Sequence, residues 1–127
     1  MSDELLLTAS EWASMMRHPV RNRAYRLTPL GAKVADYLSW KELSGAAART
    51  LETYEWVLAR FAAHHPDFEV DAVTSEHLVT YLKGVSPPSR RLAASVLRDF
   101  FKWARQWQHI PANPMDLVPK MRQTPPK

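Results

Sequence analysis

The sequence predicts an all-α bundle of four main helices with a fifth, short helical turn near its C-terminal end. Apolar residues recur at helical spacing in four stretches, at about residues 29–43, 46–65, 74–84 and 86–108. Hydroxyl-bearing, glycine and proline residues typical of helix ends bound these stretches. No stretch alternates apolar and polar residues as a half-buried strand does. The chain, at 127 residues, is long enough for one domain with a substantial core.

The first helix is expected to end at Ser44-Gly45, where the second starts. The first begins after Thr28-Pro29, a cap followed by a proline tolerated in the first turn. Its inward side would carry Leu30, Val34, Tyr37 and Leu38. The inner side of the second would carry Ala47, Thr50, Leu51, Tyr54, Val57, Leu58 and Phe61. Its outer side would hold Glu52, Glu55 and a separate line of Arg49, Thr53, Trp56 and Arg60. A tryptophan on that line indicates packing against a neighbouring element or a partner.

The third helix is short, with Thr74 as its cap and Gly84 at its end. It would bury Leu78, Val79, Tyr81 and Leu82. The preceding pair, His64-His65, is not expected to bind metal, because adjacent side chains on a helix point about 100° apart and no third ligand follows at a useful spacing.

The stretch from Ser86 to Gln108 separates its residues by chemistry most clearly. One broad apolar arc is formed by Leu92, Val96, Leu97, Phe100, Phe101, Trp103, Ala104 and Trp107. The opposite side carries Arg91, Ser95, Arg98, Lys102 and Arg105. We call these five residues the basic ridge; only Asp99, at its margin, interrupts the positive charge. The sequence therefore predicts a central helix with one buried half and one cationic half.

The net charge of +4 is unevenly distributed along the chain. Residues 1–16 contain three acids and no base, whereas Arg17, Arg21, Arg23, Arg26 and Lys33 follow without an acid between them. Acids outnumber bases from Val34 to Lys83, and the balance turns basic again from Arg90. This segregation favours a polyanionic partner, although ordinary solvated faces are the simpler alternative.

The two ends of the chain are expected to lie outside the bundle. Residues 8–16 could form a short helix with Leu7, Trp12, Met15 and Met16 on its apolar side, and residues 17–23 read as an extended basic connector. That connector either lies along a phosphate backbone or is a solvated leader. At the other end, Asn113-Pro114 should start a last helical turn from which Leu117 and Val118 fold back, before a proline-bearing linker from Pro119.

Several classes of protein are disfavoured by composition. The absence of cysteine excludes disulfides, thiolate metal sites and cysteine nucleophiles. No segment reads as a signal peptide or a membrane span, so we expect a soluble, cytoplasmic protein. We expect no cofactor, metal or small-molecule substrate, because no paired carboxylates, glycine-rich phosphate loop or serine–histidine arrangement stands out.

Four groups of residues, in this order and spacing, resemble the core-binding domain of tyrosine recombinases, the phage-integrase-like site-specific recombinases. They are Thr50, Tyr54, Leu58 and Phe61; Val73-Thr74; Leu97 to Trp103; and Ile110-Pro111-Ala112-Asn113-Pro114. The similarity covers about Thr28 to Val118. It implies a SAM-like helical domain at 29–118, an N-terminal extension at 1–28, and at 119–127 an interdomain linker to a catalytic domain that this chain lacks.

The resemblance also implies a function: half of a clamp around double-stranded DNA during DNA integration and recombination, alongside other recombinase protomers. By position, the implied DNA contacts are Thr50, Thr53, Ser89, Arg90, Arg91, Arg98, Lys102 and Arg105. Arg49, on the outer line of the second helix, is a further candidate contact. Of these, Thr50 and Arg90 point toward apolar sides in the helical projection. The family's catalytic residues belong to the separate domain, so no catalysis is expected here, and the source is expected to be bacterial or phage.

Two functions other than that of a recombinase DNA-binding domain stay open at this point. One is a helical protein-interaction or oligomerisation module that docks a partner through Trp56 or through the cluster of Trp12, Met15 and Met16. The other is a stand-alone regulatory DNA-binding protein, which is disfavoured because no compact helix-turn-helix pair precedes the basic helix.

Overall fold

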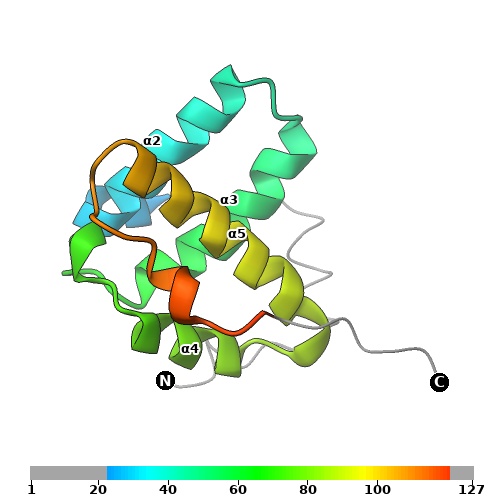
Figure 1. Cartoon of the computed structure of the whole chain (residues 1–127). Coiled ribbons are helices and arrows are strands. Elements are labelled where there is room, and N and C mark those ends of the chain that lie inside the picture. The colour runs from blue at the N-terminus through cyan, green and yellow to red at the C-terminus, as the bar shows by residue number, and fades with distance from the viewer. Residues whose placement is uncertain (1–22, 121–127) are drawn as a thin grey trace.

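The computed structural model describes residues 23–120, and these form helices and turns without a β-strand (Figure 1). Four α-helices and three 3-10 turns follow one another in this part of the chain. In order they are η2 (Ala24–Leu27), α2 (Pro29–Leu43), α3 (Ala48–Ala63), η3 (Val70–Ala72), α4 (Ser75–Gly84), α5 (Pro87–Gln106) and η4 (Pro114–Leu117). The predicted all-α class is confirmed.

Side-chain capping explains where α2, α4 and η4 begin. The Thr28 hydroxyl accepts a hydrogen bond from the Gly31 amide at 3.0 Å, with Pro29 in the first turn. Thr74 caps α4 and shares a reciprocal capping box with His77. Asn113 Oδ1 accepts from the Met115 amide at 2.8 Å and starts η4, so the predicted last turn exists but is a 3-10 turn.

α5 is the central element of the fold. It packs against α2, α3, α4 and η4, and Figure 1 shows it crossing the bundle diagonally, with η4 between it and α4. Its buried half packs against aromatic rings of the other helices. The rings of Tyr37 and Phe100 pack edge to face with their centroids 5.4 Å apart, and those of Phe61 and Phe101 do so at 6.4 Å. The predicted apolar arc is therefore the core of the molecule for most of its members.

Three predicted core positions are wrong. Ala47 is exposed because it is the extended N-cap of α3 and lies outside the helix. Trp107 is 57% exposed because α5 ends at Gln106 and the chain turns away through Gln108, whose φ is 64°. Leu117 is 81% exposed because Met115 fills the core position in the tighter η4 turn. Val118 does fold back and is buried, as predicted.

The packed unit starts before Pro29. Tyr25 in η2 is buried, and η2 packs against both α2 and α3. None of the described helices combines the length and the apolar composition needed to cross a membrane.

The close contact between η2 and α2 requires glycine at position 31. A Cβ atom there would lie 1.7 Å from the Tyr25 carbonyl oxygen and 2.7 Å from the Thr28 hydroxyl oxygen. Gly31→Ala should therefore lower the free energy of unfolding by about 1–3 kcal/mol, despite the better helix propensity of alanine. Urea unfolding measures this change, and the exposed neighbour Ala32→Ser is the control, expected within about 0.5 kcal/mol. An equally stable Gly31→Ala protein would contradict the observed packing of η2.

Candidate nucleic-acid interface

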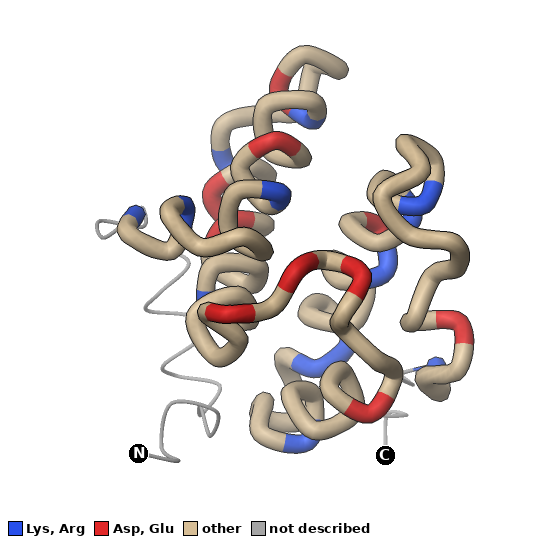
Figure 2. The backbone as a smooth tube through the Cα atoms, turned by 90° about the vertical axis from the view of Figure 1, so that its left-hand side faces the viewer, with Lys and Arg blue, Asp and Glu red and all other residues tan. Residues whose placement is uncertain are grey.

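The basic ridge lies along the solvent side of α5, as predicted. Its five residues fall within an arc of about 80° when α5 is projected at about 100° per residue. Arg98 is half-buried, and the other four are exposed: Arg91, Ser95, Lys102 and Arg105. Figure 2 shows basic positions recurring along α5, whereas both signs of charge alternate on α2 and α3 and the 67–71 connection is acidic. The structure thus presents one continuous line of positive charge on one helix.

Asp99, the one acid on α5, is bound by α2. Its Oδ2 atom lies 3.0 Å from the Lys41 ammonium nitrogen and accepts a short hydrogen bond from the Tyr37 hydroxyl. Burial, and then the Asp99 carboxylate, raise the pKa of Tyr37 well above its usual range, so this hydroxyl stays a donor. Arg98, Lys102 and Arg105, in contrast, form no ion pair with any residue from 23 to 120. Asp99 therefore neutralises little of the ridge.

Arg90 and Ser89, both expected to contact DNA, are engaged or buried within the fold. The Arg90 guanidinium donates from Nε to the carbonyls of Leu82 (2.8 Å) and Val85 (2.7 Å), and from a terminal nitrogen to that of Lys83 (3.0 Å). It therefore caps the C-terminal end of α4. Ser89 is only 9% exposed. Because both side chains serve the fold, we leave these residues out of the candidate interface.

The three expected contacts on α3 are separate from the ridge. Arg49 is exposed, whereas Thr50 and Thr53 are half-buried, and the Thr53 hydroxyl donates to the Arg49 carbonyl at 3.0 Å. They lie at the start of α3, next to the α2–α3 turn that projects from the bundle (Figure 1). No described hydrogen bond or ion pair joins them to a ridge residue.

Glu55 organises the described part of the predicted basic connector. It was expected on the outer side of α3, yet it is only 6% exposed. Its carboxylate accepts from Arg23 Nε (3.0 Å), the Tyr25 hydroxyl (2.6 Å) and Arg26 (2.8 Å). Burial alone would raise the pKa of Glu55, but these donors outweigh burial and lower it. Arg23 and Arg26 are thus held by this carboxylate, while Arg17 and Arg21 lie outside the described residues.

Two tyrosine hydroxyls donate hydrogen bonds to groups on α3. Burial, followed by the hydrogen bond to Glu55, raises the pKa of Tyr25 to about 12, so its hydroxyl remains a donor. The Tyr81 hydroxyl donates to the Val57 carbonyl at 3.3 Å, and burial raises its pKa as well. These hydroxyls are parts of the core.

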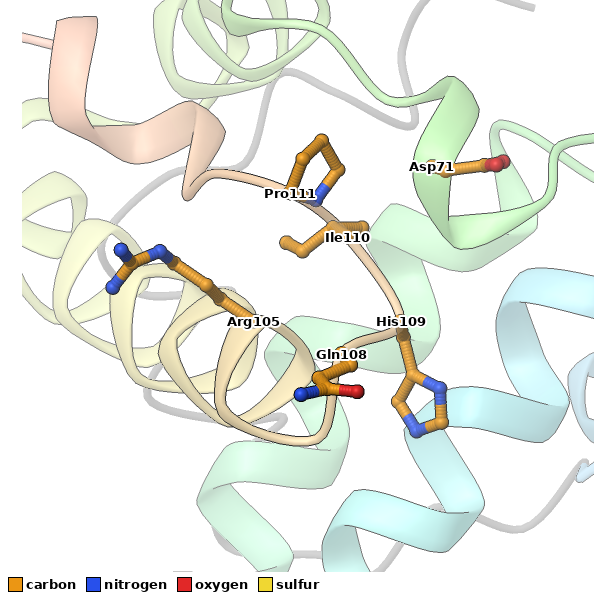
Figure 3. Close-up of a pocket in the computed structure, with 6 residues that line it drawn as sticks. All are labelled: Asp71, Arg105, Gln108, His109, Ile110 and Pro111. Atoms are coloured by element: carbon orange, nitrogen blue, oxygen red, sulfur yellow. The ribbon is translucent and has the colours of Figure 1, made fainter.

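An open cleft of about 510 Å³ lies at the C-terminal end of the ridge. It is lined by Asp71, Arg105, Gln108, His109, Ile110 and Pro111 (Figure 3). In Figure 3 the Arg105 guanidinium and the Asp71 carboxylate lie on opposite sides of segment 108–111. The cleft extends the ridge with an amide and an imidazole, which can both donate to and accept from a ligand. Sequence reasoning missed it because it depends on the left-handed turn at Gln108.

Among residues 23–120, no three histidine, aspartate or glutamate side chains are grouped so that they could hold a metal ion. No protein family, curated protein or solved structure compared with this chain matches it.

Arg90→Ala should separate a structural role from a binding role. Losing the guanidinium leaves the Leu82, Lys83 and Val85 carbonyls without their donor, so we expect unfolding to become easier by about 1–3 kcal/mol. Lys102→Ala, on the exposed ridge, should change stability by less than about 0.5 kcal/mol. Thermal and urea unfolding of the two variants measure the contrast. Equal stabilities would show that the Arg90 contacts contribute nothing.

Glu55→Gln should weaken the fold in a pH-dependent manner. At neutral pH we expect a loss of about 1–3 kcal/mol, because charge-assisted hydrogen bonds become neutral ones. The pKa of Glu55 in the folded state lies below its usual value of 4.5. The carboxylate's contribution is therefore present above that value and is lost as the pH falls through the folded-state pKa.

Urea unfolding at several pH values between about 7 and about 3 tests this linkage. The stability difference between the wild type and Glu55→Gln should shrink as the solution becomes acidic. Glu52→Gln, on the same helix and half-buried, is the matched control. A difference that is constant across this pH range would refute the assignment.

Proposed function

We propose that this chain binds double-stranded DNA through the basic ridge of α5. The observation that carries the proposal is the line of Arg91, Arg98, Lys102 and Arg105 on one exposed side of the central helix. From Arg91 to Arg105 this line spans about 21 Å at 1.5 Å per residue. The major groove of B-DNA, about 12 Å wide, admits an α-helix, and phosphates border it on both sides. A helix with one cationic side fits this environment.

The ridge residues would make different kinds of contact with DNA. Arg98 and Arg105 can donate two parallel hydrogen bonds to a phosphate or to a guanine edge, whereas Lys102 acts as a point charge. Ser95, in the middle of the ridge, adds a hydroxyl for phosphate or base contacts. Phosphate contacts supply affinity and position, and the few base contacts supply specificity.

We propose further that the chain is the SAM-like core-binding domain of a tyrosine recombinase. What supports this is the set of resembling residues between Thr28 and Val118, together with four helices at the expected places. Under this proposal it clamps DNA beside other recombinase protomers during integration and recombination, and catalysis belongs to another domain. A regulatory DNA-binding protein would share the ridge but would bind without such protomers.

A charge-reversal variant tests the ridge. Lys102→Glu combined with Arg105→Glu changes two exposed residues, so the fold should persist while phosphates are repelled. We expect at least a tenfold loss of affinity for duplex DNA at low salt, measured by fluorescence anisotropy. Lys33→Glu with Lys83→Glu, on α2 and α4, makes the same change in net charge and should lose much less.

The salt dependence gives an independent check of the same interface. Four cations on phosphates imply a slope of roughly −3 to −4 for log affinity against log salt concentration, and the ridge variant should reduce its magnitude by about 2. Circular dichroism confirms that both variants keep their helices. The proposal fails if the ridge variant and the control variant bind DNA equally, or if affinity is independent of salt.

A further inference from the structure

The turn that ends α5 holds a glutamine in a conformation that usually belongs to glycine. The Gln108 amide donates to the Arg105 carbonyl at 3.0 Å, and the His109 amide donates to the Ala104 carbonyl at 2.8 Å. These are the two hydrogen bonds of a Schellman motif, in which Gln108 occupies the position where glycine is most common. Its φ of 64° is unfavourable for a residue with a side chain. A strained residue of this kind indicates a function for the side chain that it carries.

The Gln108 side chain is open to a ligand although its backbone is anchored. It is exposed and lines the cleft of about 510 Å³ at the C-terminal end of the basic ridge. Figure 3 shows its amide beside the last turn of α5. Two residues further on, Ile110 is buried and fixes the segment that leaves the turn. The amide is therefore held in place by the fold without being used by it.

The charges around the cleft favour the edge of a base over a phosphate. The cleft has the Arg105 guanidinium on one side and the Asp71 carboxylate on the other, whereas the ridge contains no acid. A phosphate is negatively charged and has only acceptors, so Asp71 repels it. The edge of a base pair in the major groove is uncharged and presents both donors and acceptors. A glutamine amide also provides both, and its best-matched base is adenine, through N6 and N7.

The two ends of α5 differ in which side chains can reach a base. At the N-terminal end, the Arg90 guanidinium is bound by the carbonyls at the end of α4, and Ser89 is buried. At the C-terminal end, the side chains of Arg105 and Gln108 form no hydrogen bond or ion pair within the part of the chain that the structure describes. Base reading is therefore expected at the C-terminal end.

We propose that Gln108 is a specificity-determining residue that reads an adenine in the major groove while the basic ridge holds the adjoining phosphates. This inference rests on the proposed DNA binding and deepens it, because it assigns a sequence preference to a residue outside the ridge. Arg105, where ridge and cleft meet, contacts the phosphate beside that base pair. Asp71 keeps the phosphate backbone out of the cleft.

Selection from a library of random-sequence DNA duplexes tests the role of Gln108, with anisotropy titrations of the selected duplex. The wild type should select an A·T pair at one position, and another pair there should lower its affinity about tenfold. Gln108→Glu should change this preference to C·G, because a carboxylate accepts from cytosine N4. Gln108→Gly should lose the preference and keep the fold, because glycine suits the left-handed turn. Gln106→Glu, at an exposed glutamine outside the cleft, should keep the preference for adenine.

Asp71→Asn tests the second part of the proposal. Without the carboxylate, phosphates can enter the cleft, so affinity for all duplexes should rise several-fold and the preference for the A·T pair should decrease. Asp67→Asn makes the same change in charge at an exposed residue of the same connection, outside the cleft. It should leave the preference for that pair unchanged.

The possible failures are distinguishable from one another. If the wild type binds duplex DNA but selects no pair, or if both Gln108 variants keep its preference, the inference is overturned and DNA binding stands. If Gln108→Gly binds every duplex equally more weakly and keeps the preference, Gln108 is a phosphate contact and the inference is also overturned. If the wild type binds no duplex at all, the DNA-binding proposal fails and this inference fails with it. Circular dichroism confirms that each variant keeps its helices.

Discussion

The burial of one half of α5 is the constraint on which the rest of the structure depends. Leu97, Phe100 and Phe101 are fully buried where α5 meets the neighbouring helices. Each such side chain contributes about 1.5–3 kcal/mol relative to an exposed one, so turning α5 about its axis would cost several times the thermal energy. Because a close-packed core allows no such rotation, the direction of the opposite side is fixed as well. The outward direction of the basic ridge is therefore a consequence of core packing.

Two carboxylates, those of Glu55 and Asp99, form ion pairs that join one element of the fold to another. Glu55 holds Arg23 and Arg26 against α3, and Asp99 holds Lys41 against α5. Both carboxylates also accept a hydrogen bond from a tyrosine hydroxyl, which ties η2 to α3 and α2 to α5. These pairs cross between helices, whereas the ridge cations lie along a single helix. The cations that pair with Glu55 and Asp99 are thus different residues from those proposed to bind DNA.

The sequence predicted the helices well because their signals are local. Thr28, Thr74 and Asn113 cap the elements that they were expected to start, and the apolar spacing marks the buried sides. The features that the sequence could not predict depend on contacts between residues distant in the chain, or on the direction in which the chain leaves a helix. Glu55 is buried because partners about 30 residues earlier return to it. Arg90 reaches the end of α4 only because of the angle between α4 and α5. Trp107 is exposed because α5 stops one residue before it.

The most direct measurement of the central claim is an amide chemical-shift map of the full chain titrated with a short DNA duplex at low salt. If α5 has one half for the core and one half for nucleic acid, the largest shifts will fall at Arg91, Ser95, Arg98, Lys102 and Arg105 and at the adjoining turn at Gln108. The signals of α2 around Lys33 should hardly move. Shifts centred on α2 or on the 67–71 connection, or no shifts at all, would contradict this account.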